Sequence, residues 1–98
     1  MEIKGLTFVK TCNCCSEQYE VYRNGKHIGY VRLRLRWGTL TCEYPNLDGE
    51  LVYCVDMDSD IQGEFNSDKE RMFHLEAIAD KLLKADNKTR NKKKHMLI

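Results

Sequence analysis

Apolar and polar residues alternate along much of the first half of the chain, which is the pattern of strands with one buried face. The segments that show this alternation are residues 18–23, 27–37, 39–44 and 50–56. Asn24-Gly25 between the first two is a strong hairpin signal, while Gly38 and residues 45–49 separate the others. Residues 2–10 can add a further strand. The pattern predicts an antiparallel β-meander of four to five strands.

The pattern becomes helical after residue 67. Ser67 and Glu70 have the spacing of a capping box, which typically starts a helix. Apolar residues then recur at three- and four-residue intervals to about residue 84, and His74 lies beside them at the expected surface or boundary. The stripe consists of Met72, Leu75, Ile78, Ala79, Leu82 and Leu83. We therefore predict an α+β fold with one C-terminal helix packed on one face of the sheet.

The pairing of the strands can be predicted because apolar side chains of neighbouring strands must share a face. A turn at residues 37–38 places Leu33 opposite Cys42 and Arg32 opposite Glu43. The pairs predicted between the last two strands are Tyr44 with Leu51, Cys42 with Tyr53, and Leu40 with Val55. All of these pairs keep the apolar residues on the face that the helix should cover.

Two turn geometries are compatible with the first hairpin. A two-residue turn at residues 24–25 puts Tyr19 and Val21 on the polar face, unless a bulge intervenes, for which Gly29 is the natural position. A loop one residue longer, with Gly25 in the left-handed conformation, puts both side chains on the core face without a bulge. We favour the longer loop.

Three arginines, Arg32, Arg34 and Arg36, share the polar face of the longest strand, with only Glu43 in direct register. Arginine forks bind phosphate and carboxylate groups, and aromatic rings can stack on bases. The row is either a solvated surface or a surface for an anion or an acidic partner. The predicted ligand-binding residues are Arg32, Arg34, Arg36, Tyr22, Tyr30, Trp37 and Thr41.

The chain has five cysteines. The candidate metal ligands are Cys12, Cys14, Cys15 and His27. Structural zinc sites usually use two paired-ligand motifs, and the remaining Cys42 and Cys54 point to opposite faces in the predicted register. Free thiols are therefore the favoured reading, and no cofactor is expected.

An acidic connection, residues 56–66, precedes the helix. Its alternating aspartates resemble the start of a calcium loop, but Ile61 and Ser67 stand where that loop needs glycine and glutamate. A solvated connection is favoured over a weak divalent-cation site.

Ninety-eight residues, 42% hydrophobic and 32% charged, are typical of one globular domain. The net charge of +1 is unevenly distributed. Residues 88–98 contain five of the 16 basic residues and none of the 15 acidic ones, which leaves 11 basic against 15 acidic residues in residues 1–87. We predict a domain at residues 1–87 and a flexible basic tail at residues 88–98, with nucleic acid as a candidate partner of the tail.

The sequence has neither an apolar run long enough to span a membrane nor a signal-peptide pattern, which predicts a cytoplasmic protein. It also has no Ser/His/Asp constellation, phosphate-binding glycine loop or HExxH motif. We therefore expect a protein that is not an enzyme.

Residues 14–53 resemble a family of small phage and bacterial proteins whose core reads approximately CxEQY, GYxRLR, a glycine, a proline turn and a Val-Tyr strand. Ser16 stands where the family has proline, and Leu35-Arg36 extends the arginine strand. The matching residues are Cys15, Glu17, Gln18, Tyr19, Gly29, Tyr30, Arg32, Leu33, Arg34, Gly38, Pro45, Gly49, Val52 and Tyr53. The resemblance implies a phage or mobile-element origin.

Small phage proteins of this kind often counteract host defence. The leading hypothesis is a non-enzymatic binding protein, acting in the host cytoplasm, that sequesters an anionic, nucleotide-like ligand on the arginine face, with the site completed in a homo-oligomer. One alternative is an inhibitor that docks on a host defence protein. Another is a nucleic-acid-binding accessory protein that uses the basic tail.

Overall fold

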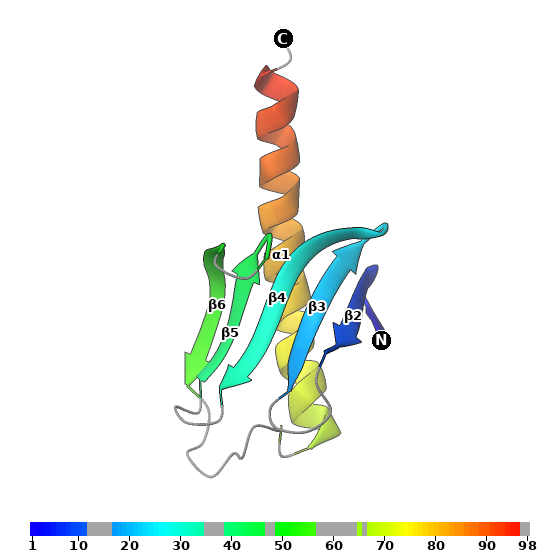
Figure 1. Cartoon of the computed structure of the whole chain (residues 1–98), viewed down its shortest axis with the longest axis vertical. Coiled ribbons are helices and arrows are strands. Elements are labelled where there is room, and N and C mark those ends of the chain that lie inside the picture. The colour runs from blue at the N-terminus through cyan, green and yellow to red at the C-terminus, as the bar shows by residue number, and fades with distance from the viewer. Residues whose placement is uncertain (12–16, 35–38, 47–48, 57–64, 66, 97–98) are drawn as a thin grey trace.

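The computed structural model describes residues 1–11, 17–34, 39–46, 49–56, 65 and 67–96; for residues 34 and 92–96 it describes the backbone alone. Strands adjacent in sequence are adjacent in one antiparallel sheet (Figure 1). These strands are β1 (Glu2–Ile3), β2 (Leu6–Lys10), β3 (Gln18–Arg23), β4 (Lys26–Arg34), β5 (Thr39–Tyr44) and β6 (Glu50–Asp56). The helix α1 (Asp68–Met96) follows them. The predicted α+β meander with a C-terminal helix is confirmed.

The sheet has six strands rather than four to five, because residues 2–10 form a hairpin instead of a single strand. The chain reverses at Lys4-Gly5, where the φ angles of 52° and 82° lie in the left-handed region that glycine adopts readily. Asn24-Gly25 has the same pair of φ angles. It therefore forms the two-residue hairpin turn that an Asn-Gly pair favours.

The start of α1 agrees with the prediction, and its end does not. Ser67 Oγ accepts a hydrogen bond from the Glu70 amide at 3.1 Å, which gives a partner to one of the unpaired amides of the first turn. The predicted end near residue 84 is wrong, because α1 continues through Met96. Residues 88–96, which we predicted to be a tail, are thus helical. The apolar stripe stops near residue 84, but no glycine or proline follows to stop the helix.

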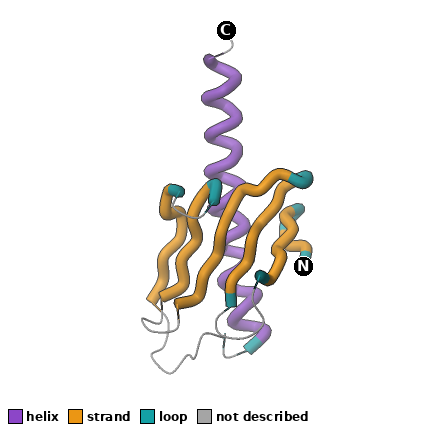
Figure 2. The backbone as a smooth tube through the Cα atoms, in the orientation of Figure 1, coloured by secondary structure: helices purple, strands orange, loops and turns teal. Residues whose placement is uncertain are grey.

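The hydrophobic core lies between α1 and one face of the sheet (Figure 2). The fully buried part of the helix stripe is Leu75, Ile78, Ala79 and Leu82. The buried apolar residues of the sheet are Ile3, Leu6, Phe8, Tyr19, Val21, Ile28, Val31, Leu33, Leu40, Cys42 and Tyr44. Within the described residues, no helix or strand covers the opposite face, which the viewer sees in Figure 1.

Two helix residues differ from their predicted places. Met72, assigned to the buried stripe, is 36% exposed. His74, expected at the surface or boundary, is buried, and its Nδ1 lies 3.0 Å from Tyr53 Oη. The helix is therefore rotated slightly from the predicted orientation, so that His74 rather than Met72 faces the sheet.

The first hairpin combines the two-residue turn with a bulge. Arg23 pairs with Lys26, but Val21 pairs with Gly29, so the register shifts by one residue inside the hairpin. Tyr19 is thereby buried, as is Val21. The favoured longer loop is wrong, whereas the alternative of a bulge near Gly29 is confirmed. A Cβ on Gly29 would lie 2.8 Å from the Leu82 side chain, so α1 approaches β4 closely at this point.

The register of β4 with β5 differs from the predicted register by two residues. Leu33 lies opposite Leu40 and Arg32 opposite Thr41, and the last described pair of these two strands is Arg34 with Thr39. A shift of two residues preserves the face of every side chain, so the buried set is unchanged. Between β5 and β6, the pairs Cys42–Tyr53 and Leu40–Val55 are confirmed. Beyond them, Glu43 pairs with Leu51, so the predicted Tyr44–Leu51 pair is wrong and Tyr44 pairs with Glu50.

Candidate functional site

Some of the predicted ligand-binding residues lie together on the uncovered face of the sheet. Register places Gln18, Arg32 and Thr41 in one row across β3, β4 and β5. Tyr30 lies in the adjacent row on the same face, between Glu20 and Glu43. Three of the predicted residues, Tyr30, Arg32 and Thr41, are thus neighbours. We call Gln18, Tyr30, Arg32 and Thr41 the Arg32 site.

Arg32 is the centre of this site. Its guanidinium carbon lies 5.9 Å from the centroid of the Tyr30 ring, which is a cation–π distance. Its Nη2 is 4.0 Å from Glu43 Oε1, a separation too long for a hydrogen bond. Arg32 Nε is buried and has no hydrogen-bond partner among the residues that the structure describes. The fork is therefore held in place with part of its donor capacity unused.

The neighbours of Arg32 are themselves ordered by hydrogen bonds. Tyr30 Oη donates to Gln18 Oε1 at 2.7 Å. Thr41, which is 8% exposed, donates from Oγ1 to the Arg32 carbonyl oxygen at 3.5 Å. Both contacts connect adjacent strands, so the site has a preorganised frame.

The remaining predicted ligand residues are not all brought together. Arg34 shares the Arg32 face by register, opposite Thr39. Tyr22 lies outside the Arg32 site, toward the hairpin turn, where it pairs with His27 and donates to Glu20, the residue opposite Tyr30. Arg36 and Trp37 lie outside the described residues.

The acidic residues on this face differ from the expectation that Glu43 faces Arg32 directly. Glu43 lies opposite Tyr30, and Glu20 lies on the other side of Tyr30. The Tyr30 row is therefore acidic, while the rows of Arg32 and Arg34 are basic. An anion is favoured at the Arg34 end of the site and disfavoured at the Tyr30 end.

The candidate metal ligands, against which free thiols are favoured, are only partly described by the structure. Cys12, Cys14 and Cys15 lie outside the described residues. His27 is described, and its ring centroid is 5.2 Å from that of Tyr22. In the described part of the chain, no group of three potential ligands is close enough to hold a metal ion. The acidic segment 57–64 also lies outside this part.

The two described cysteines are free thiols with different environments. Burial, aided by the charge of Glu43, raises the pKa of Cys42 to about 12. Its thiol is therefore protonated at neutral pH and is a poor nucleophile. Cys54 is exposed at the far edge of the Arg32 row, opposite Thr41.

Sequence reasoning missed a buried carboxylate, Glu17, which directly precedes β3 in the chain and contacts Arg71 in the first turn of α1. It is 2% exposed and accepts hydrogen bonds from Arg71 Nη2 at 2.6 Å and from Tyr19 Oη at 2.7 Å. Burial alone would raise the pKa of Glu17, but the bonds from Arg71 and Tyr19 outweigh it and hold the pKa below its usual value. Arg71 also pairs with Asp68. This cluster attaches the first turn of α1 to β3.

A second buried carboxylate, Asp86, was also missed. It is fully buried and accepts bonds from Arg23 Nη1 at 2.8 Å and from Tyr44 Oη at 3.0 Å. Arg90 Nε lies 3.3 Å away on the next helical turn. Burial alone would raise the pKa of Asp86, but the bonds from Arg23 and Tyr44 and the two positive charges lower it. This cluster attaches α1 to β3 and β5 at the other end of the core.

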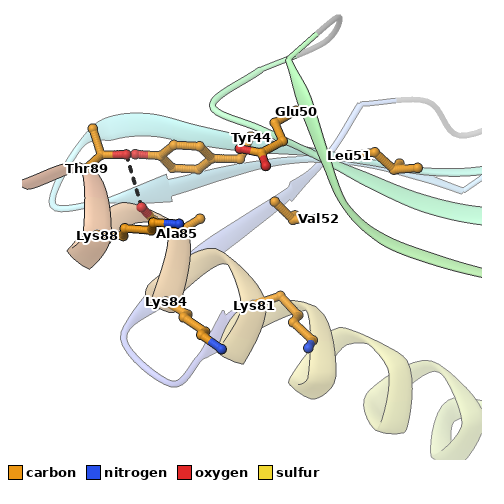
Figure 3. A pocket seen from close by; sticks show the side chains of 9 residues that line it. All are labelled: Tyr44, Glu50, Leu51, Val52, Lys81, Lys84, Ala85, Lys88 and Thr89. Atoms are coloured by element: carbon orange, nitrogen blue, oxygen red, sulfur yellow. Dashed lines mark hydrogen bonds between the residues drawn. The ribbon is translucent and has the colours of Figure 1, made fainter. Parts of the chain in front are cut away.

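A groove of about 380 Å³ lies between α1 and the β5–β6 side of the sheet (Figure 3). It is on the α1 side of the sheet, opposite the Arg32 site. Its lining residues are Tyr44, Glu50, Leu51, Val52, Lys81, Lys84, Ala85, Lys88 and Thr89. The helix contributes three lysines and the sheet one glutamate, so the lining is cationic.

No family model, curated protein or solved structure matches the chain. In the described residues, no helix is apolar over a length that could cross a lipid bilayer. Function must therefore be argued from the surfaces described above.

Proposed function

We propose that the protein is a non-enzymatic binding protein that holds an anionic, nucleotide-like ligand at the Arg32 site. The observation that carries this proposal is the buried Arg32 Nε, which has no acceptor among the described residues. A buried N–H without a partner costs about 1–3 kcal/mol. Because Nε is buried, a phosphate oxygen would reach it only after a shift of the Arg32 side chain; the contact would then remove that cost and use the bidentate geometry of the guanidinium.

The residues around Arg32 indicate how such a ligand would be oriented. The phosphate would lie toward Arg34, away from Glu20 and Glu43. The Tyr30 ring, which already lies near the guanidinium, offers a surface on which a base could stack. The ligand would thus extend along β4, with its negative charge at one end.

The resemblance to small phage and bacterial proteins supports a biological role for such binding. We propose that the protein withdraws a nucleotide signal from a bacterial defence system. A flat sheet face covers only one side of a ligand, so a second copy of the chain would complete the site. Expression in bacteria that carry a nucleotide-signalling defence should protect an infecting phage, and the Arg32→Gln variant should not.

Thermal shift and calorimetry with mononucleotides, ADP-ribose and cyclic dinucleotides test the binding directly. At least one of these nucleotides should raise the melting temperature of the wild-type protein. Arg32→Gln should lose the shift, because the amide lacks the charge and the fork. Lys26→Gln is the matched control, since it removes an exposed positive charge at the other end of β4 and should keep the shift. The absence of any shift with all three classes contradicts the proposal.

A second candidate function is nucleic-acid binding by the end of α1. The observation that favours it is that the basic residues after Lys88 belong to a helix that projects beyond the sheet (Figure 1). Clustered cations on a projecting helix are suited to phosphate contacts. Deleting residues 91–98 should abolish a salt-sensitive shift of DNA or RNA in a gel. An unchanged shift contradicts this role.

A further inference from the structure

The outer edge of β6 is open within the described residues. β6 is the last strand of the sheet and pairs only with β5 in this part of the chain. An edge strand presents unpaired N–H and C=O groups on its outer side, which can pair with another extended segment. β6 is seven residues long, whereas the opposite edge, β1, has two. β6 is therefore the edge that is long enough for a stable pairing.

The helix beside this edge carries unneutralised cations. Lys81, Lys84 and Lys88 are exposed, line the groove, and have no acidic partner within salt-bridge distance among the described residues. Figure 3 shows them on successive turns of α1: Lys88 lies beside Ala85, and the Lys81 and Lys84 side chains extend outward, away from the strand that carries Glu50. Three lysines against one glutamate leave an excess of two positive charges.

Apolar residues form part of the lining of the groove, between the strand and the lysines. Val52 and Ala85 are partly buried and pack against the core. Leu51 is 54% exposed, and Val52 is the extra residue of a bulge between Tyr53 and Leu51. A segment added to β6 would direct alternate side chains toward α1, into this groove. Apolar atoms of those side chains would contact Val52 and Ala85.

We propose that β6 and the neighbouring turns of α1 bind an extended acidic segment of a partner protein, which adds to the sheet as a further strand. Alternate residues of a strand are about 6.6–6.8 Å apart. Lys84 and Lys88 are about 6 Å apart along the helix axis. Acidic residues at every second position of the segment would therefore lie at nearly the spacing of Lys84 and Lys88, whereas Lys81 and Lys84 are closer, at about 4.5 Å along the axis.

Charge favours an acidic segment of a partner protein over a second copy of the chain as the occupant of the β6 edge. Glu50 and Asp56 stand at the two ends of β6. Antiparallel pairing of two β6 strands in full register would bring Glu50 of each copy toward Asp56 of the other, and like charges opposite one another are destabilising. A segment with acidic side chains directed toward the lysines and neutral residues near the strand ends avoids this conflict.

The test uses the full chain and a fluorescent peptide in which glutamate and valine alternate over the central residues, between neutral ends. A peptide of alternating lysine and valine is its matched control. The glutamate peptide should bind, and binding should weaken by about tenfold or more when Lys81, Lys84 and Lys88 are all replaced by glutamine. Replacement of the exposed Lys10, Lys26 and Lys69 by glutamine removes the same charge and should leave binding unchanged.

Amide hydrogen exchange tests the strand addition itself. The peptide should protect those β6 amides that point away from β5, and no other strand should gain comparable protection. Equal binding of the lysine peptide, equal binding by the groove variant, or unchanged exchange in β6 overturns the proposal. Protection of β6 that rises with protein concentration in the absence of peptide also overturns it, because a second copy then occupies the edge.

Discussion

The two flanks of α1 use charged residues in opposite ways. On the side of β1 to β3, carboxylates are matched with cations: Asp80 with Lys4, Asp86 with Arg23, and Glu17 with Arg71. On the side of β6, Lys81, Lys84 and Lys88 have no acidic partner among the described residues. The first flank contains two buried carboxylates, and the second contains exposed lysines along a groove.

This contrast indicates which charges maintain the fold. A buried carboxylate must be paired, because an unpaired charge inside a protein is strongly destabilising. An exposed lysine is solvated and needs no partner, so its charge is free to attract a ligand. The paired flank is thus expected to determine stability, and the unpaired flank to determine binding.

The largest expected effect is on Asp86. Asp86→Ala removes the acceptor of Arg23 and Tyr44 and leaves a cavity beneath Arg90. We expect the free energy of unfolding to fall by about 3 kcal/mol, measured by urea denaturation at pH 7. Asp80→Ala is the control, because its pair with Lys4 is exposed and should contribute less than about 1 kcal/mol. Equal losses in the two variants would contradict the distinction between the buried Asp86 cluster and the exposed Asp80–Lys4 pair.

Glu17→Gln should have the next largest effect. Glutamine preserves the shape of the side chain but removes the charge that holds Arg71. We expect a loss of about 2 kcal/mol in the free energy of unfolding. In the double variant Glu17→Gln/Arg71→Gln, the loss in the free energy of unfolding should be much smaller than the sum of the losses in the two single variants. Additive losses would show that the pair is not a unit.

Acid should weaken the paired flank. The pKa values of Glu17 and Asp86 are lowered in the folded protein, so the unfolded state binds more protons. Their contribution is complete above the unfolded pKa values of about 4 and is lost as pH falls through the folded values. The free energy of unfolding should therefore decline below about pH 4.5, and less steeply in Glu17→Gln than in the wild type. A parallel decline in both proteins contradicts the role of Glu17.

The smallest effect is expected on the unpaired flank. Lys84→Gln removes one of three neighbouring positive charges and no described contact. The free energy of unfolding should change by less than about 0.5 kcal/mol. A loss above about 1 kcal/mol would show that Lys84 stabilises the fold.

The fold was largely predictable from the sequence because its signals are local. The alternation of β3 to β6, Asn24-Gly25, and the Ser67 cap each specify structure within a few residues. The register of β4 with β5 was not predictable, because two-residue slips preserve the buried face and the apolar pattern accepts either. The bulge near Gly29 could be anticipated, because an unbulged two-residue turn would expose Tyr19 and Val21.

The buried charges were missed because their partners are far apart in the chain. Glu17 and Arg71 are 54 positions apart, and Arg23 and Asp86 are 63. A signal was nevertheless present: Arg71 lies four positions before Leu75, and Asp86 four positions after Leu82, in line with the apolar stripe. Charged residues that continue a buried stripe indicate buried ion pairs. The Arg32 site was only partly predictable, since the position of Glu43 depends on the register.

Urea unfolding with and without the glutamate–valine peptide tests in one measurement whether the unpaired flank contributes to binding and not to stability. Without peptide, the variant with Lys81, Lys84 and Lys88 replaced by glutamine should be as stable as the wild type. Peptide at about ten times its dissociation constant should stabilise the wild type by about 1.4 kcal/mol and the variant by much less. A variant that is destabilised without peptide, or stabilised equally by it, contradicts the assignment of binding to the unpaired flank.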